Sequence, residues 1–254
     1  MIYKAEHCTV SIDDVDILRD VSLTGQTGDL IGIVGPNGSG KSTWLQSLCG
    51  LLPLKSGCIS IDETNITDVE GRELAHVVAY MQQQVAIQFT YSAYDIVMMG
   101  RYPQIHWWRQ EGIEDTQIVK QAMEYVGVWH LRNKTIQHMS GGERQRVFLA
   151  KAIAQETEIL LLDEPTAALD ITHTHRLFQL CQQLCQKNKL IIVVVHDLEL
   201  AAKYCSKLYL LAQGRVVAFG SPQQVLHSEN LERVYGVKTD IFTDGYGEIR
   251  IHVI

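Results

Sequence analysis

The amino-acid sequence predicts an α/β fold with a mainly parallel sheet, a small antiparallel β part and an inserted helical subdomain. Short β-branched or leucine-rich runs alternate with amphipathic helical segments, which is typical of a parallel sheet covered by helices. The segment 90–155 departs from this alternation, because it contains several helical stretches and no convincing strand. We therefore expect one domain over 1–254, in which 1–89 and 156–254 form the core and 90–155 is the insertion.

The core elements follow from runs of apolar residues. A buried strand is predicted at 30–34 and is followed by a glycine-rich loop and a helix over 42–52. Runs at 159–162 and 190–195 are short and uniformly apolar, which predicts strands inside a parallel sheet. Between them, 171–187 has apolar residues at spacings of three and four, which predicts a crossover helix.

The remaining predicted elements are the helices of the insertion, a hairpin around Ala-Gln-Gly, a short helix and a C-terminal β element. The helices of the insertion are predicted at 93–99, 114–126 and 142–154. The hairpin pairs 207–211 with 215–219, the short helix follows Pro222, and the C-terminal β element lies at 240–254.

Composition excludes several classes of protein. A chain of 254 residues that is 46% hydrophobic is neither disordered, nor collagen-like, nor a short disulfide scaffold. Lys and Arg number 22 against 29 Asp and Glu, so a broad basic face for nucleic acid is not expected. The six cysteines include no CxxC pair, which indicates a reducing cytosol. Cys181 and Cys185 share a predicted helix face, but two thiols make only half a metal site, and ordinary packing is favoured.

No membrane-targeting feature is visible. Residues 1–14 contain no basic stretch followed by an apolar segment, so no export signal is expected. The longest strongly apolar run, 190–195, is far shorter than the roughly 20 residues that span a bilayer. We expect a chain that stays inside the cell and reaches a membrane only through another protein.

The loop after the first predicted strand reads GPNGSGKST and fits GxxxxGK[ST], the phosphate-binding loop, in its expected place between a strand and a helix. Glycines let backbone N–H groups converge on phosphate oxygens, and the helix N-terminus adds partial positive charge. We expect Lys41 to reach the β- and γ-phosphates of a nucleotide and Ser42 to offer its hydroxyl to Mg²⁺. The residues of the loop are Gly35, Pro36, Asn37, Gly38, Ser39, Gly40, Lys41, Ser42 and Thr43.

Two carboxylates end the predicted strand 159–162. Asp163 is suited to hold Mg²⁺ through water, and Glu164 to orient or deprotonate a water molecule that attacks the γ-phosphate. A strand that merely ends at a helix N-terminus is the alternative, which the phosphate-binding loop disfavours. His196 closes the strand 190–195 at the same sheet edge.

A second anion site is predicted where Ser140, Gly141 and Gly142 open a helix. Ser140 and Glu143 have the capping-box spacing, and the glycines leave the first amides open to a ligand. The chain has no second phosphate-binding loop, so the phosphate must come from elsewhere. A good helix start is the simpler alternative.

With these residues in order, the chain resembles the nucleotide-binding subunits of ATP-binding cassette (ABC) transporters over nearly its whole length. The resemblance implies a P-loop NTPase (RecA-like) fold, a single ABC ATPase domain, and ATP with Mg²⁺. The motifs are Walker A at 35–43, a glutamine loop at 80–83, a signature at 139–145, Walker B ending at 163–164, a D-loop at 168–170 and the switch histidine His196.

The resemblance also implies a role for each motif. Two subunits would form a head-to-tail homodimer, in which each signature faces the ATP bound by the other subunit. Glu164 would activate water, His196 would contact the γ-phosphate, and Gln83 would touch Mg²⁺ and link the site to the insertion. The implied metal set is Ser42, Gln83 and Asp163, and the implied nucleotide set adds Ser140, Gly141, Gly142 and Asp170 to the phosphate-binding loop.

Three positions depart from the family pattern. Ile12 stands where the family often has an aromatic residue that stacks on adenine. The run 82–84 is Gln-Gln-Gln, which leaves a one-residue ambiguity, and counting from Tyr80 favours Gln83. Met139 replaces the usual leucine, a nearly volume-neutral exchange.

The segment 89–103 resembles importers of iron chelates, haem and vitamin B12, because Val97, Gly100, Arg101 and Pro103 match their pattern and Gln104 replaces a histidine. The resemblance implies two multi-span permease subunits, a substrate-binding protein and a place at the cytoplasmic face of the inner membrane. Next to this segment, the pair 107–108 (Trp-Trp) fits a groove that grips a permease helix, and burial against the insertion fits equally.

Other functions are disfavoured. An exporter or lipid-handling ATPase is less consistent with the importer-like segment, and a soluble ABC ATPase acting on DNA or ribosomes usually has a second cassette or a long coiled coil. A metabolite kinase would have no use for the signature helix. A metal site could be suspected at four histidines: His106, His138, His173 and His175. We favour the simpler interpretation that these are ordinary solvent-exposed side chains.

Overall fold

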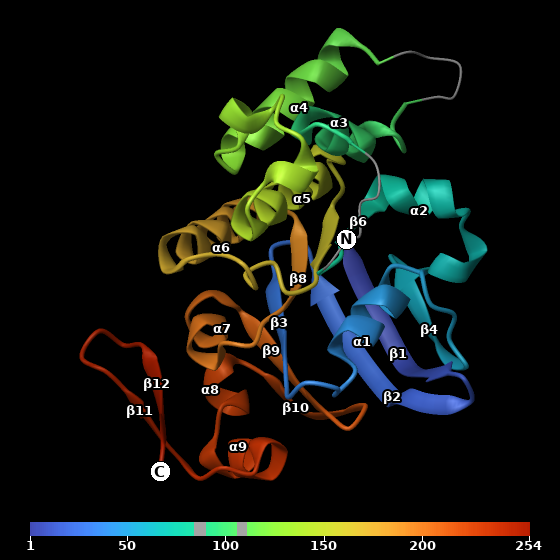
Figure 1. Ribbon diagram of the computed structural model, residues 1–254. Coiled ribbons are helices and arrows are strands. Elements are labelled where there is room, and N and C mark those ends of the chain that lie inside the picture. Colours follow the sequence, from blue (N-terminus) through green and yellow to red (C-terminus); the bar gives the residue numbers. More distant parts are fainter. Residues whose placement is uncertain (84–89, 106–110) are drawn as a thin grey trace.

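The structure, a computed structural model, describes residues 1–83, 90–105 and 111–254. Its centre is a six-stranded sheet with the order β10-β9-β3-β8-β7-β6 (Figure 1). Neighbouring strands are parallel except β9 with β10, which form the predicted hairpin. The strands are β3 Leu30–Val34, β6 Val78–Met81, β7 Ile159–Leu162, β8 Leu190–Val194, β9 Lys207–Ala212 and β10 Arg215–Gly220. The predicted α/β fold with a mainly parallel sheet is confirmed.

Both faces of the central sheet are covered. Ile31 and Ile33 of β3 belong to an apolar cluster shared with α1 and the N-terminal strands. Leu30 and Val34, which point the other way, belong to a cluster shared with α6 and α7. Because alternate side chains of a strand face opposite sides, a strand that is covered on both sides is a continuous apolar run. This explains why the three buried strands are visible in the sequence.

The described helices are α1 Lys41–Leu48, α2 Gly71–Val77, α3 Ala93–Met98, α4 Ile113–Tyr125, α5 Gly141–Ala154, α6 Ile171–Gln186, α7 Leu198–Tyr204, α8 Pro222–Val225 and α9 Ser228–Tyr235. The predicted ends of α3, α4, α5 and α6 are correct to within one residue and the short helix at Pro222 is present, whereas α2, α7 and α9 were not predicted. The helix predicted over 42–52 is too long, because Gly50 has a φ of +74°, a left-handed conformation typical of helix C-termini. Among the described residues, no helix combines the length and apolar character needed to cross a bilayer.

The antiparallel part consists of a four-stranded sheet, β2-β1-β4-β5, and a two-stranded sheet, β11-β12. Its strands are β1 Ile2–Ile12, β2 Val15–Gln26, β4 Ser56–Ile61, β5 Thr64–Asn65, β11 Thr239–Thr243 and β12 Ile249–Val253. The sequence predicts only the C-terminal pair. The register of β1 against β2 shifts after Ala5 and after Cys8, and His7 and Asp20 have φ of +53° and +56°. Such β-bulges interrupt the alternation of buried and exposed residues by which a half-buried strand is recognised.

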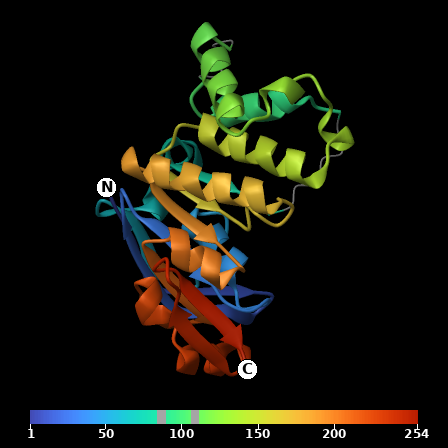
Figure 2. The ribbon, with the colours of Figure 1, turned by 90° about the vertical axis from the view of Figure 1, so that its left-hand side faces the viewer.

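Helices α3, α4 and α5 form a layer at one end of the molecule (Figure 2), with an apolar cluster of their own. Met139, which replaces the usual leucine of the family pattern, is buried in this cluster. Gly100, in the turn after α3, lies against α5, and a Cβ atom there would stand 2.3 Å from the carbonyl oxygen of Lys151. Only glycine allows this close approach.

Arg101, whose own side chain is buried, links the same three helices. Its Nε donates to Asp115 Oδ1 at 3.1 Å, and its Nη1 donates to the carbonyl oxygen of Ala154 at 2.7 Å and to Glu156 Oε2 at 2.9 Å. The Arg101 and Asp115 side chains are both 7% exposed.

Replacing Arg101 with methionine is expected to lower the free energy of unfolding by about 3–5 kcal/mol, because the buried Asp115 carboxylate loses its cationic partner. Urea unfolding measures this loss. Lys120→Met, which removes an exposed i,i+4 pair with Glu124, is the control and should cost at most about 0.5 kcal/mol. Equal costs for the two variants would show that the Arg101 cluster does not stabilise the helical layer.

Candidate functional site

The carboxyl ends of β3, β7 and β8 meet at one edge of the central sheet, where parallel sheets hold their ligands. The glycine-rich loop follows β3, Asp163 and Glu164 follow β7, and His196 lies two residues after β8. A cavity of about 530 Å³ opens at this edge. It is lined by Ile17, Asn37, Gly38, Gly40, Lys41, Ser42, Thr43, Gln83, Glu164 and His196.

Glycine is required at several points of the loop between β3 and α1. Gly38 and Gly40 have φ of +75° and +102°, which other residues adopt only with strain. A Cβ atom on Gly35 would stand 2.1 Å from the carbonyl oxygen of Leu211 in β9. The loop is therefore packed tightly against the sheet while its amides remain at the cavity.

The Lys41 side chain lies inside the loop. Its Nζ donates to the carbonyl oxygens of Gly35 and Pro36, both at 2.9 Å. Burial lowers the pKa of Lys41 below its ordinary value, and the nearby Glu164 and Asp163 carboxylates oppose this shift. Neutral carbonyl oxygens thus hold the ammonium group at the cavity. A phosphate oxygen would replace them as its acceptor, because a hydrogen bond between two charged groups is stronger.

Asp163 is buried behind the loop and is 2% exposed. Its Oδ1 accepts from Ser42 Oγ at 3.0 Å, and its Oδ2 accepts from the Tyr80 hydroxyl at 3.3 Å. Burial raises the pKa of Asp163, Glu164 raises it further, and the Ser42 hydrogen bond opposes both. A hydroxyl and a carboxylate oxygen this close together are the hard ligands that Mg²⁺ prefers, so the residues present fit that ion.

The Glu164 carboxylate is held by two polar side chains. Its Oε1 lies 2.6 Å from His196 Nε2, and its Oε2 accepts from Gln83 Nε2. The structure therefore brings together three residues that are far apart in the sequence. Of the described glutamines in the run, Gln83 lines the cavity and Gln82 is exposed, while Gln84 lies outside the described residues.

The backbone at Glu164 is unusual. Its φ of +47° places a non-glycine residue in the left-handed region, which costs about 1–2 kcal/mol. The Glu164 carbonyl oxygen accepts from Gln145 Nε2 of α5 at 3.0 Å. The strained peptide is thus fixed by a residue from the helical layer.

The signature residues Ser140, Gly141 and Gly142 do not line this cavity, and neither does Asp170. The predicted capping box at the start of α5 is present: Ser140 Oγ accepts from the Glu143 amide at 3.2 Å, and Glu143 Oε2 accepts from the Ser140 amide at 2.8 Å. Ser140 and Gly141 are exposed.

The starts of α5 and α6 are neighbours. A Cβ atom on Gly142 would stand 2.9 Å from the carbonyl oxygen of Ala168, just before α6. Asp170 caps α6, because its Oδ1 accepts from the His173 amide at 2.8 Å. Within one chain, this pair of helix starts is separate from the cavity that holds Lys41.

Sequence reasoning missed two residues of this site. Ile17, not Ile12, lines the cavity, and Ile12 is 41% exposed on β1. Gln145 was recognised only as part of the signature, although a polar residue on the buried face of a predicted helix is a signal for a specific hydrogen bond.

The other candidate metal residues do not assemble. Among the described residues, no group of three or more His, Cys, Asp or Glu side chains is placed to hold a metal ion. Cys181 and Cys185 are buried in the core beside the sheet. The pair 107–108 and His106 lie outside the described residues.

Comparison with known proteins places the chain in a family. A family model described as ABC transporter matches residues 18–167. The hemin import ATP-binding protein HmuV of Pseudomonas fluorescens is 38% identical over 232 residues, which cover 89% of this chain and 89% of that protein. The cobalamin import ATP-binding protein BtuD of Halobacterium salinarum is 35% identical over 236 residues, which cover 92% of this chain and 59% of that protein.

Solved structures agree with the sequence relatives. A transporter assigned to the metal-chelate type, solved in an inward-facing conformation, has a TM-score of 0.84 at 27% identity and covers 99% of this chain and 96% of its own. A dimeric bacterial ABC transporter cassette has a TM-score of 0.78 at 26% identity and covers 87% of this chain and 99% of its own. The chain belongs to the ABC transporter family, as one of its ATP-binding, ATP-hydrolysing proteins.

Proposed function

We propose that the chain is the ATPase subunit that powers import of a metal chelate or related metal compound, of the iron-siderophore, haem, cobalamin or metal-oxyanion type. The observation that carries this proposal is the identity of 38% to a hemin import ATP-binding protein over most of both chains. The match to a metal-chelate type transporter over 99% of this chain supports the same substrate class. An export-type or soluble ABC ATPase is the alternative.

In the proposed ATPase subunit, Lys41 and the loop amides bind the β- and γ-phosphates. Mg²⁺ would be held by Ser42, Asp163 and Gln83. The ion would neutralise phosphate charge when bound. The apolar side chain of Ile17 lines the cavity and offers a contact for the purine ring.

Glu164 is the proposed general base. Gln83 and His196 hold its carboxylate at the cavity through the contacts described above. When nucleotide binds and these two side chains turn to it, a carboxylate oxygen of Glu164 would accept a proton from the attacking water. His196, whose side chain is 44% exposed, would turn to the γ-phosphate when nucleotide binds.

The proposed division of the chain has a core over 1–89 and 156–254 and a helical subdomain over 90–155 that carries the signature. The separate apolar cluster of α3, α4 and α5 supports it. Because Ser140, Gly141, Gly142 and Asp170 do not line the cavity of their own chain, we infer that they act across a head-to-tail homodimer. The dimeric cassette with the same fold supports this arrangement.

The proposed assembly also contains two multi-span permease subunits and, indirectly, a substrate-binding protein. The chain would lie at the cytoplasmic face of the inner membrane, held there by the permease, and would bind no nucleic acid. The test is to purify the chain with its membrane partner and to measure ATPase activity with different loaded binding proteins. Stimulation by a metal-chelate-loaded protein supports the proposal, and stimulation only by proteins loaded with metal-free solutes contradicts it.

Asp163→Asn is expected to raise the melting temperature of the nucleotide-free chain by a few degrees, because it removes a buried negative charge whose burial is unfavourable. It should also abolish the further stabilisation that Mg²⁺-ATP gives the wild type. Because the pKa of Asp163 is raised in the folded chain, its charge costs stability above that pKa and the cost disappears as pH falls through it. The difference between variant and wild type should therefore shrink with falling pH. Thermal denaturation checks both effects, and a variant less stable than wild type at neutral pH would contradict the argument.

A further inference from the structure

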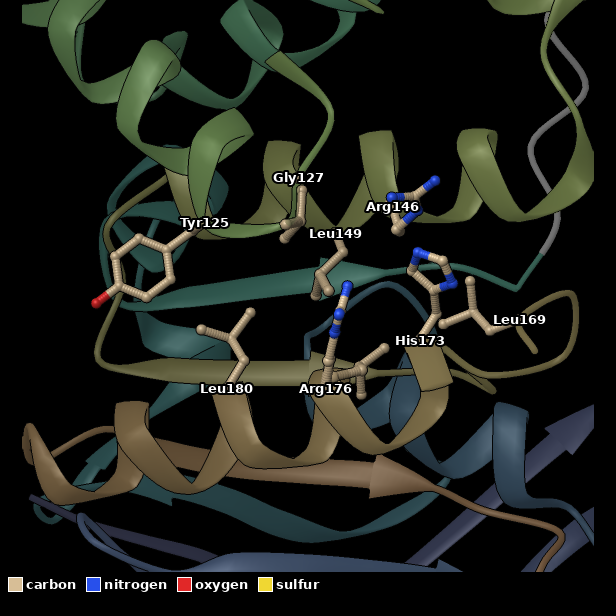
Figure 3. Close-up of a pocket in the computed structure, with 10 residues that line it drawn as sticks. Tyr125, Gly127, Arg146, Leu149, Leu169, His173, Arg176 and Leu180 are labelled. Carbon is tan, nitrogen blue, oxygen red and sulfur yellow. The ribbon is translucent and has the colours of Figure 1, made fainter. Parts of the chain in front are cut away.

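A second cavity, of about 300 Å³, lies between α5 and α6 (Figure 3). Its inner walls are apolar: Leu149 of α5 and Leu177 and Leu180 of α6 line it, and all three are buried. It shares no lining residue with the cavity that contains Lys41. Its volume is at the lower end of the range in which proteins bind small molecules.

Two arginines line this cavity, Arg146 on α5 and Arg176 on α6. Arg176 extends from α6 toward α5 (Figure 3), and it makes no hydrogen bond or ion pair with any residue that the structure describes. Among the described residues, Arg146 of α5 forms one hydrogen bond, from its Nε to the carbonyl oxygen of Gly142 at 3.4 Å. The terminal amino groups of both arginines are therefore available to a ligand.

The charge around the cavity favours a negatively charged ligand. Arg146 and Arg176 line it, and Lys187 donates to the hydroxyl of the lining residue Tyr125, whereas Asp170, near Arg146 and hydrogen-bonded to His173, is the acidic group beside them. A carboxylate also matches the planar guanidinium group, with which it forms paired hydrogen bonds.

We propose that this cavity binds a small organic carboxylate, whose charged group pairs with Arg146 and Arg176 and whose apolar part packs on Leu149, Leu177 and Leu180. The site is separate from the nucleotide site and stands on its own contacts, independent of the proposed import function. Two of the residues that line it, Arg146 and His173, are bonded to Gly142 and Asp170. An occupant therefore touches residues attached to the starts of both α5 and α6.

The test uses 3-phenylpropionate as the probe and its uncharged amide, 3-phenylpropanamide, as the chemical control. Isothermal titration calorimetry on the purified full chain without nucleotide is expected to give a Kd of about 1 mM or tighter for the carboxylate and much weaker binding of the amide. Arg176→Gln should weaken carboxylate binding about tenfold or more, and Arg176→Lys should weaken it less, because lysine keeps the charge but not the paired geometry.

The matched control is Arg215→Gln, which removes an exposed arginine on β10 and should leave the affinity unchanged. Arg176 is also exposed, so its replacement should leave the melting temperature near that of wild type. No measurable carboxylate binding, equal affinity for the amide, or full affinity in a folded Arg176→Gln chain would each overturn the proposal.

Discussion

Glu164→Gln is expected to lower ATP turnover by about 10²–10⁴-fold while ATP still binds, and to accumulate an ATP-bound dimer. The amide has the size of the carboxylate but accepts no proton from water, so the proposed general base is lost. The phosphate-binding loop and Ser42 are unchanged by this substitution. ATPase assays measure the turnover, and gel filtration with excess Mg²⁺-ATP measures the dimer.

Glu158→Gln is the control, because Glu158 lies at the opposite end of β7, is exposed and is remote from the cavity. It should keep wild-type turnover and should not trap a dimer. A Glu164→Gln chain that remains monomeric with excess ATP would contradict the shared-site mechanism. Wild-type turnover in that chain would contradict the role of Glu164 itself.

Lys41→Ala is expected to weaken ATP binding by about 100-fold, since charge-assisted hydrogen bonds contribute roughly 1.5–3 kcal/mol each and Lys41 is placed to make more than one to phosphate. The chain itself should not unfold. Lys41 is buried and its pKa is lowered by burial, so the loss of its charge removes a desolvation cost. Equilibrium binding of a fluorescent ATP analogue and the melting temperature without nucleotide measure the two effects.

Lys55→Ala is the matched lysine variant. Lys55 pairs with Asp16 on the surface, at 2.8 Å, and does not line the cavity. Its replacement should leave ATP affinity unchanged. If Lys41→Ala bound ATP as tightly as Lys55→Ala, the loop would not be the phosphate site.

The grouping of the candidate site residues at one sheet edge was predictable, because these residues belong to short contiguous segments that directly follow buried strands. Lys41 and Ser42 belong to one short motif after a strand, and Asp163 and Glu164 directly end another. Strands that are buried on both faces are continuous apolar runs, so the position of these motifs at a common sheet edge follows from the sequence.

The features that were not predicted depend on contacts between distant segments. The N-terminal sheet is hidden by β-bulges, which spoil the periodicity of β1 and β2. The placement of Ile17 in the cavity depends on how β2 packs beside the loop, and the hydrogen bond from Gln145 to Glu164 depends on how α5 crosses the end of β7. Spacing along a chain does not encode such contacts.

The hydrogen bond from Gln145 to the Glu164 peptide has a consequence for how two active sites communicate. In the proposed head-to-tail pair, one end of α5 meets the ATP of the neighbouring subunit, while Gln145, one turn further along, steadies the general base of its own subunit. A tilt of this helix as it contacts the neighbour's ATP would therefore also displace the peptide of Glu164. Each ATP site would then respond to whether the other site is occupied, and the two ATP molecules would be hydrolysed in a coordinated cycle.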